Sequence, residues 1–404
     1  MSKFIQIHTL TSYPASLLNR DDAGFAKRIP FGDGTRTRIS SQCLKRHWRG
    51  FEGLESLRHV GAPMSVRSRI TLDHEVFQAL KKEGVDEALA REVTEQVKAA
   101  VFGKSDKAKA KEDAAEKKPG DGAATVAAGR TEQVTVLGRP EIDYFLAHAR
   151  AVCAERPSIK EVKAKVEARF KDARKNLEAL RTGAGLDAAL FGRMVTSDVL
   201  ARCDAAVHVA HAFTVHAEFA ETDYFSAIDE LEREREDAQL GSGHIGTSEL
   251  TSGLFYGYVV VDVPLLVSNV ESCEAPRWRD ADRTLSAEVI RRLVHLVATV
   301  SPGAKLGSTA PHAYAQAVLV ESGDAQPRTL ANAFLRGVAR SDLLGKTYRA
   351  LDEHVAAFDG MYGWDGRRSH AAMHAGDTLP EARFGARVNV PALATWAAAR
   401  VLEG

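Results

Sequence analysis

Basic residues concentrate in one short stretch, residues 19–49, which reads NRDDAGFAKRIPFGDGTRTRISSQCLKRHWR. Eight basic residues stand there against three acidic ones: Arg20, Lys27, Arg28, Arg36, Arg38, Lys45, Arg46 and Arg49 against Asp21, Asp22 and Asp33. Several fixed cations in a row can neutralise successive phosphates, and the hydroxyl of Ser40 and the amide of Gln42 add hydrogen-bond donors. The stretch therefore predicts a phosphate-binding surface. The alternative is a basic face that only water covers.

A second set of basic residues lies beside an apolar stripe in residues 158–182. Ser158 and Glu161 have the spacing of a capping box, which predicts that a helix begins there. The basic residues next to its apolar stripe are Lys160, Lys163, Lys171, Arg174 and Arg181. Glu167 and Glu178 share this stripe, so ion pairs within a surface helix are the alternative to a binding surface.

Two adjacent aromatic residues, Tyr224 and Phe225, interrupt an acidic segment. Residues 218–237 contain nine acidic residues and two arginines. Aromatic rings in such a charged element can stack on nucleic-acid bases, an interaction worth about 1–3 kcal/mol per base. The alternative is a small local core that holds a hairpin or a helix together.

The candidates for metal binding or catalysis are few. Asp21 and Asp22 could hold a metal or activate water, but no third ligand is evident, and a turn or a salt bridge with Arg20 is the alternative. His370 and His374 have the spacing of two zinc ligands on a helix, without a cysteine nearby. No CxxC, HExxH or GxSxG motif is present. We therefore expect no catalytic residue, no metal and no cofactor.

The elements that must position these residues follow from periodicity. Strands are predicted over residues 4–11, 205–217, 252–262 and 312–321, and helices from Ser40 or Ser41 to about Leu57 and over 285–300. Residues 60–188 are mostly helical and predict an inserted lobe. Within it, residues 104–132 contain almost no large apolar residue and predict a mobile loop. The order strand, helix, strands, helix, strand predicts an α+β fold with a split βαβ sheet of the ferredoxin type.

Composition limits the class of protein. The chain has 404 residues, of which 45% are hydrophobic, and its formal net charge is zero. No run approaches the roughly 18 apolar residues that a membrane span needs, and the first residues lack the features of a secretory signal. The four scattered cysteines indicate reduced thiols. We expect a cytoplasmic protein without a membrane partner, in which any charge that binds phosphate is local.

Blocks along nearly the whole chain resemble the CasC family, the backbone subunit of the type I-E CRISPR Cascade complex. The blocks are, in order, FIQIHTL, LNRDDAGFAK, RTRISSQCLKR, FGRMVTSD, HVAHAFTVH, DYFSAIDEL, GSGHIGTSELTSGLFYGY, PGAKLGSTAP and TLANAF. The combination of NRDD with RISSQCLKR is the most specific. The glycine-rich GHIGTSELTSG block supports the resemblance independently.

The resemblance implies a hand-shaped subunit. Its parts would be a ferredoxin-like (modified RNA-recognition) palm, an inserted helical fingers lobe and a thumb hairpin. The implied boundaries are 1–59 for the first part of the palm, 60–188 for the fingers, 189–217 for the palm again, 218–248 for the thumb, and 249–404 for the rest of the palm with C-terminal helices.

The resemblance also implies residue roles. The residues that would bind the guide RNA are Arg20, Lys27, Arg38, Ser40, Gln42, Lys45, Arg46 and Arg49. Met194 would wedge beside a displaced base, and Tyr224 and Phe225 would sit on the thumb at the same kink. Lys160, Lys163 and Lys171 would face target DNA.

The implied partners are the CRISPR guide RNA, the target DNA strand, further copies of the chain and other Cascade subunits. The sequence would be read by base pairing between guide and target. A second hypothesis is an RNA endonuclease, since type III relatives cut target RNA with a loop aspartate, here Asp21 or Asp22. A third is a helical scaffold that binds only other proteins.

Overall fold

The computed structural model describes residues 3–103, 128–171, 173–178, 183–193, 200, 203–227, 244–374 and 379–403. These residues form two compact units. Unit 1 comprises Met1–His59, His208–Val263 and Ser286–Gly404, and unit 2 comprises Val60–Val207 and Pro264–Leu285. Residues 189–207 and 264–285, which the sequence-based division gave to the palm, are therefore grouped with unit 2.

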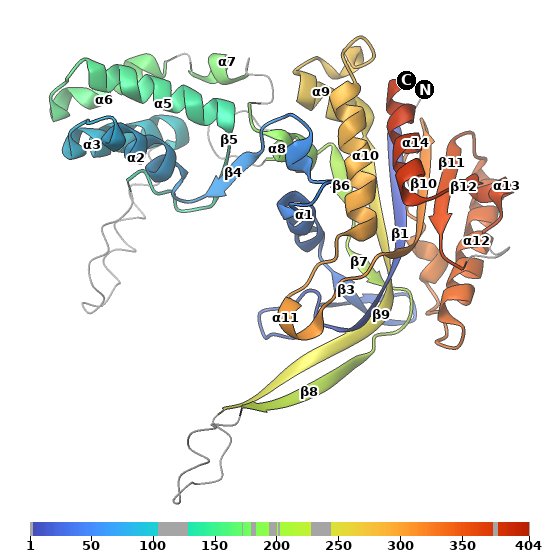
Figure 1. Ribbon diagram of the computed structural model, residues 1–404. Coiled ribbons are helices and arrows are strands. Elements are labelled where there is room, and N and C mark those ends of the chain that lie inside the picture. The colour runs from blue at the N-terminus through green and yellow to red at the C-terminus, as the bar shows by residue number, and fades with distance from the viewer. Residues whose placement is uncertain are drawn as a thin grey trace, which may run out of the picture. The chain divides into compact units, whose positions relative to one another are not determined.

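A mixed sheet organises unit 1 (Figure 1). Its strands are β1 (Phe4–Ser16), β2 (Arg28–Phe31), β3 (Gly34–Ile39), β6 (Val207–Val209), β7 (Ala212–Thr214), β8 (Ala220–Ala227), β9 (His244–Asp262), β10 (Ala315–Gly323), β11 (Arg367–Ala372) and β12 (Ala386–Arg387). The strand order is β12-β11-β10-β1-β9-β7-β3-β2, with β6 and β8 also pairing with β9. The central strand β1 is antiparallel to both neighbours, so that Ile7 lies opposite Val259 and Val320. The fold is α+β, as predicted.

The remaining elements of unit 1 are helical. They are α1 (Ser41–Gly50), η1 (Leu57–His59), α10 (Thr284–Thr299), α11 (Leu306–Thr309), η5 (Ala331–Phe334), α12 (Leu343–Tyr362), α13 (Glu381–Phe384) and α14 (Val390–Leu402).

Both faces of the central strands are covered, because successive side chains of a strand point to opposite sides. On one face, Trp48 of α1 and Val297 of α10 line a small cavity together with Phe255 and Val259 of β9. On the other face, Tyr256 of β9 belongs to a buried apolar cluster that includes residues of η5 and α12. This double burial explains why β1 reads as a continuous buried strand from Ile5 to Thr11.

Helix α1 is shorter than predicted. Ser40 caps it as expected, its side chain accepting a hydrogen bond from the Cys43 amide. The helix ends at Gly50, because Phe51 is already extended, and Leu54 is 90% exposed. The expectation that the helix continues to about Leu57 is therefore wrong.

Unit 2 is mainly helical. Its elements are β4 (Ser65–Ser68), η2 (Asp73–Phe77), α2 (Gln78–Lys82), α3 (Glu87–Phe102), β5 (Thr135–Gly138), α5 (Arg139–Ala154), α6 (Ile159–Arg169), α7 (Ala173–Glu178), α8 (Leu186–Phe191), α9 (Val263–Glu271) and η4 (Ala275–Arg277). The capping box of Ser158 and Glu161 is confirmed. The single helix predicted over 158–182 is not, because α6 ends at Arg169 and α7 is a separate helix. The mobile loop was predicted over residues 104–132, and most of these residues lie outside the described ones.

The C-terminal region contains more sheet than the sequence indicated. The resemblance implied C-terminal helices there. The structure has α12, with 20 residues, and also β11 and β12, which extend the sheet. His370 is buried in β11, and His374 follows the strand with a positive φ of 52°. The spacing of these two histidines therefore does not place them on one face of a helix.

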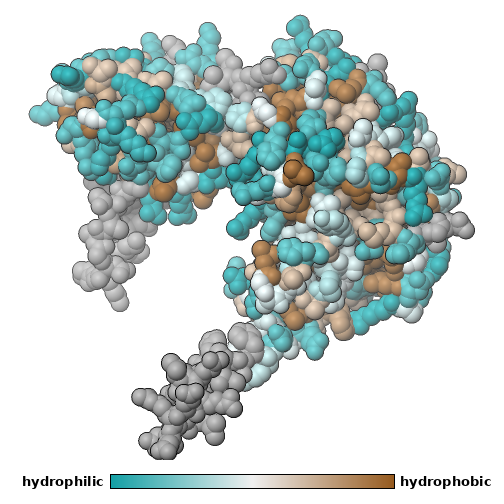
Figure 2. All heavy atoms as spheres, in the orientation of Figure 1, coloured by the Kyte–Doolittle hydropathy of each residue, from teal (hydrophilic) through white to brown (hydrophobic). Residues whose placement is uncertain are grey.

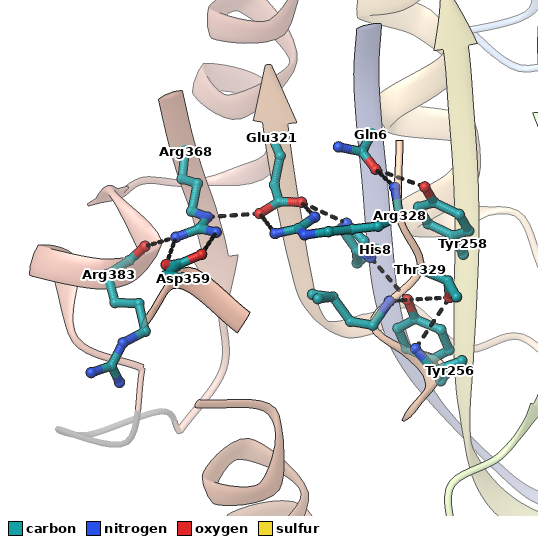
Figure 3. A network of polar contacts seen from close by, with 12 residues as sticks. Gln6, His8, Tyr256, Tyr258, Glu321, Arg328, Thr329, Asp359, Arg368 and Arg383 are labelled. Atoms are coloured by element: carbon teal, nitrogen blue, oxygen red, sulfur yellow. Dashed lines mark hydrogen bonds and ion pairs between the residues drawn. The ribbon is translucent and has the colours of Figure 1, made fainter. Parts of the chain in front are cut away.

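A buried charge network joins the strands of unit 1 (Figure 3). Glu321 of β10 is fully buried and accepts hydrogen bonds from Arg328 (2.9 Å), Arg368 (2.7 Å) and His8 (3.2 Å). Arg368 also binds both oxygens of Asp359, at 2.6 and 2.8 Å. Burial opposes ionisation of Glu321, but the bonds from Arg328 and His8 outweigh it and hold the pKa of this carboxyl far below its usual range. The network ties β1, β10, β11 and α12 together through the His8 ring, the carboxylates of Glu321 and Asp359 and the guanidinium groups of Arg328 and Arg368.

Candidate nucleic-acid interface

The basic stretch 19–49 folds around Asn19. The main-chain oxygen of Asn19 accepts from the Lys27 amide (3.0 Å), and its side-chain oxygen accepts from the Ser40 amide (2.9 Å). The Lys27 carbonyl in turn accepts from the Arg38 amide (2.8 Å). These bonds bring residues from the end of β1, the following loop and the start of α1 to one place, together with Arg20, which directly follows Asn19.

The loop between Arg20 and Ala26 is closed by a backbone bridge between these two residues. At its tip, the Asp21 carboxylate accepts hydrogen bonds from the amides of Ala23 (3.0 Å) and Phe25 (2.9 Å). The predicted turn is thus confirmed for Asp21. No group of three or more His, Cys, Asp or Glu that could hold a metal occurs in the part of the chain that the structure describes.

Two of the basic residues, Arg28 and Arg36, form ion pairs within the chain. Arg28 forms ion pairs with Glu218 and Glu249. Arg36 is fully buried, where it binds Asp33 (2.7 Å) and the main-chain oxygen of Phe334 (3.3 Å). The charge surplus of the sequence stretch therefore overstates the number of cations on its surface.

An open groove of about 700 Å³ lies at the N-terminal end of α1. It is lined by Leu18, Asn19, Arg20, Ser40, Gln42, Cys43, Arg46, His47, Gly50, Gly303, Ala304 and Leu306. Four of the predicted guide-binding residues, Arg20, Ser40, Gln42 and Arg46, are thus brought to one surface. Lys45 and Arg49 are half-buried on the same helix and do not line the groove.

The opposite wall of the groove was not predicted. Gly303, Ala304 and Leu306 belong to the PGAKLG block, which carried the resemblance without an assigned role. The Ala304 amide donates to the Leu17 carbonyl (2.9 Å), which fixes the loop beside the end of β1. A Cβ on Gly303 would lie 2.7 Å from side-chain atoms of both Leu306 and Pro311, so this close packing requires glycine.

Two cations of the basic stretch, Arg38 and Lys27, place positive charge around His211. Burial lowers the pKa of His211, and the nearby cations Arg38 and Lys27 lower it further. Arg38 donates to Nδ1 of His211 (2.9 Å) and, through Nε, to the Arg28 carbonyl (3.1 Å). Both acceptors are neutral at neutral pH, so these bonds leave the charge of Arg38 available to an anion.

The comparisons with known proteins identify a family. The family model described as "CT1975-like protein" matches residues 5–396. The chain belongs to this family. One similar solved structure, titled "CRISPR RNA-guided surveillance complex, pre-nicking", is 27% identical, covers 98% of this chain and 100% of the other, and has a TM-score of 0.77. No curated protein matches the chain.

A second solved structure shares the fold with this CT1975-like chain. It is titled "CRISPR RNA-guided surveillance complex", is 24% identical, covers 98% of this chain and 99% of the other, and has a TM-score of 0.66.

The hairpin of unit 1 presents one of the two predicted aromatic residues to solvent. Strands β8 and β9 pair from Ala220 opposite Thr251 to Ala227 opposite His244. Tyr224 is 62% exposed, so it does not belong to a local core. The side chain of Phe225 lies outside the described residues, as do Met194 and residues 228–243.

The basic residues predicted to face DNA lie on unit 2. Lys160 and Lys163 are exposed on α6, and Lys171 is exposed just after it. Nζ of Lys163 lies 3.9 Å from a carboxylate oxygen of Glu167, which is near the outer limit of an ion pair. The ion pair that was the alternative to a binding surface is therefore weak at this position. The side chain of Arg174, with Arg181, lies outside the described residues.

The surface of the face seen in Figure 2 is mostly hydrophilic. On the face seen in Figure 2, hydrophobic residues lie in small areas between hydrophilic ones. No helix among the described ranges is both long and apolar enough to cross a membrane.

Proposed function

We propose that this chain binds CRISPR guide RNA as a repeating, non-catalytic backbone subunit of an RNA-guided surveillance complex. The observation that carries the proposal is the groove in which Arg20, Ser40, Gln42 and Arg46 meet. Membership of the CT1975-like family and the likeness to a chain of a CRISPR RNA-guided complex support it. The motif blocks favour type I-E Cascade and the CasC family as the finer classification.

The groove suits a nucleic-acid backbone. Its cations would neutralise phosphates, while the Ser40 hydroxyl and the Gln42 amide would bind phosphate or sugar oxygens, and none of these contacts depends on base identity. Anions are also favoured near the N-terminal end of α1, where backbone amides lack intrahelical partners. A groove that holds the backbone leaves base edges free for pairing with a target strand.

The proposal assigns the parts of a hand to the two units. The order β10-β1-β9-β7, all antiparallel, with α1 after β1 and α10 after β9, supports a ferredoxin-like palm in unit 1. Unit 2 would be the fingers, with Lys160, Lys163 and Lys171 toward target DNA. The β8–β9 hairpin would be the thumb, with Tyr224, Phe225 and Met194 at the displaced base.

The proposed partners are the guide RNA, the target DNA strand, further copies of the chain and other Cascade subunits in the cytoplasm. The third hypothesis, a scaffold for proteins alone, gives no reason for four backbone-binding groups to meet in an open groove. Nucleic acid that co-purifies with the protein would support the proposal.

The decisive experiment removes two cations from the groove. The double variant Arg20→Ala, Arg46→Ala should bind single-stranded RNA more weakly, whatever its sequence. Each lost phosphate contact should also reduce the log–log dependence of affinity on salt by about 0.7. The matched control is Arg349→Ala, an exposed arginine of α12 that pairs with Asp342. Unchanged affinity and unchanged salt dependence in the double variant would contradict the proposal.

A second experiment tests the proposal that the chain is non-catalytic. The Asp21 carboxylate already caps a turn through two amides, so its replacement should alter the loop and not a reaction. Complementary RNA incubated with the assembled complex and magnesium should stay intact. Cleavage at regular intervals that Asp21→Ala or Asp22→Ala abolishes would instead establish the endonuclease hypothesis.

A further inference from the structure

A hydrogen bond from Arg38 sets the tautomer of His211. Arg38 donates from Nη1 to Nδ1 of His211 at 2.9 Å. A guanidinium has no acceptor, so Nδ1 must be the acceptor, and the neutral imidazole then carries its proton on Nε2. The pairing of Arg38 with Phe213 across β3 and β7 fixes this geometry, because His211 directly precedes β7.

A second histidine, inside the groove, has the opposite tautomer. Nδ1 of His47 lies 2.8 Å from the main-chain oxygen of Cys43. A carbonyl oxygen only accepts, so Nδ1 of His47 carries the proton and Nε2 is an acceptor. Phosphate oxygens also accept at neutral pH. The neutral ring of His211 therefore offers a phosphate a donor, whereas the neutral ring of His47 offers only a lone pair.

The groups around His211 keep the ring neutral. Burial lowers its pKa first, and the charges of Arg38 on β3 and Lys27 in the preceding loop lower it further. The ring is consequently neutral at physiological pH. Protonation would place a proton on Nδ1 and break the bond from Arg38, so the neutral ring is the form that fits this geometry.

We propose that His211 is a further RNA-contact residue, which donates a hydrogen bond from Nε2 to a backbone phosphate held beside Arg38. This inference rests on the proposed function and adds a residue that the basic stretch of the sequence does not contain. His211 therefore contributes to RNA affinity while it is neutral, as a hydrogen-bond donor and not as a cation.

The experiment compares three variants of the full chain with poly(U) as the probe. At about pH 8, where unperturbed histidines are neutral, His211→Ala should bind roughly tenfold more weakly, the effect of one hydrogen bond to a charged group. His211→Gln should recover part of this loss, because the amide of Gln can also donate. His374→Ala, at an exposed position that does not line the groove, should keep the wild-type affinity at this pH.

The salt dependence separates a neutral donor from a cation. At about pH 8, His211→Ala should keep the wild-type slope of affinity against salt, because a neutral ring neutralises no phosphate. A slope reduced as in the Arg20, Arg46 double variant would overturn the inference. Imidazole ¹⁵N spectra of the intact chain should show an unprotonated Nδ1 in His211 and a protonated Nδ1 in His47, and the reverse would also overturn it.

The outcomes distinguish this inference from the function on which it rests. If the Arg20, Arg46 double variant weakens RNA binding and His211→Ala does not, the inference fails and the proposed function stands. If neither variant weakens binding, the proposed function fails. Thermal unfolding of each variant, with a midpoint within a few degrees of wild type, ensures that lost binding is not lost folding.

Discussion

Arginine serves opposite purposes in two regions of unit 1. In the groove, Arg20 and Arg46 are exposed and line a space open to solvent. In the buried network, Arg328 and Arg368 both pair with Glu321, and Arg368 also pairs with Asp359 (Figure 3). The groove cations are available to a ligand because the fold leaves them without full compensation. The network cations stabilise the fold because every strong bond that they make is internal.

The largest expected effect comes from the network. Arg368→Ala should lower the free energy of unfolding by about 3 kcal/mol, because the buried Glu321 loses one of its two arginine partners and Asp359 loses both bonds from Arg368. The control is Arg367→Ala, its neighbour in the chain, which is 67% exposed and pairs with Glu403 at 3.2 Å. That variant should change stability by no more than about 1 kcal/mol. Urea unfolding measures both, and equal effects would show that burial does not separate the two arginines.

The next effect concerns pH. Burial lowers the pKa of His8 below 6.5, and Glu321 is lowered below 4.5. For both groups the unfolded chain binds more protons than the folded chain, so each contributes stability above its unfolded pKa that is lost as the pH falls. Stability should therefore decrease from about pH 7 to about pH 5, mainly through buried histidines, and more steeply below that as Glu321 contributes.

His8→Gln tests this assignment. It should be less stable than wild type near pH 7 but should lose less stability between pH 7 and pH 5, by about 1.4 kcal/mol for each unit by which burial lowers the pKa. His374→Gln, at an exposed position, should follow the wild-type curve. A His8→Gln curve parallel to wild type would contradict a neutral, buried His8.

The smallest effect on stability is expected at the hairpin. Tyr224→Ala should change the free energy of unfolding by less than about 0.5 kcal/mol, because the side chain is 62% exposed. The same change should weaken the periodic pattern of reactive bases when guide RNA in the assembled complex is probed chemically. Tyr13→Ala is the contrast, since that ring is buried against Phe255. A loss of stability with Tyr224→Ala comparable to that of Tyr13→Ala would place Tyr224 in a core.

Local features were predictable from the sequence. The Ser40 cap, the Ser158 capping box, the turn at Asp21 and the central strands depend on contacts within a few residues or on the alternation of side chains. Such signals are present in the order of residues itself. The position where α1 ends was missed because apolar spacing continues to Leu54 although the helix does not.

Long-range features were not predictable. The partners of Arg28, Glu218 and Glu249, lie about two hundred residues away in the sequence. Arg36 has Asp33 nearby, but its burial against Phe334, about three hundred residues away, leaves no local signal. The groove wall at Gly303 and the role inferred for His211 were missed for the same reason. A basic stretch therefore locates a candidate surface, and only packing decides which of its cations reach solvent.

The ion pairs at the base of the hairpin have a mechanical consequence. Glu249 of β9 accepts from the Ala26 amide (2.6 Å) and pairs with Arg28, which also pairs with Glu218 just before β8. The two legs of the hairpin are thereby anchored to the loop that carries Arg20. A sideways force on the hairpin would act on this loop through charged bonds whose strength falls with ionic strength. The hairpin can thus be regarded as a lever whose stiffness depends on salt.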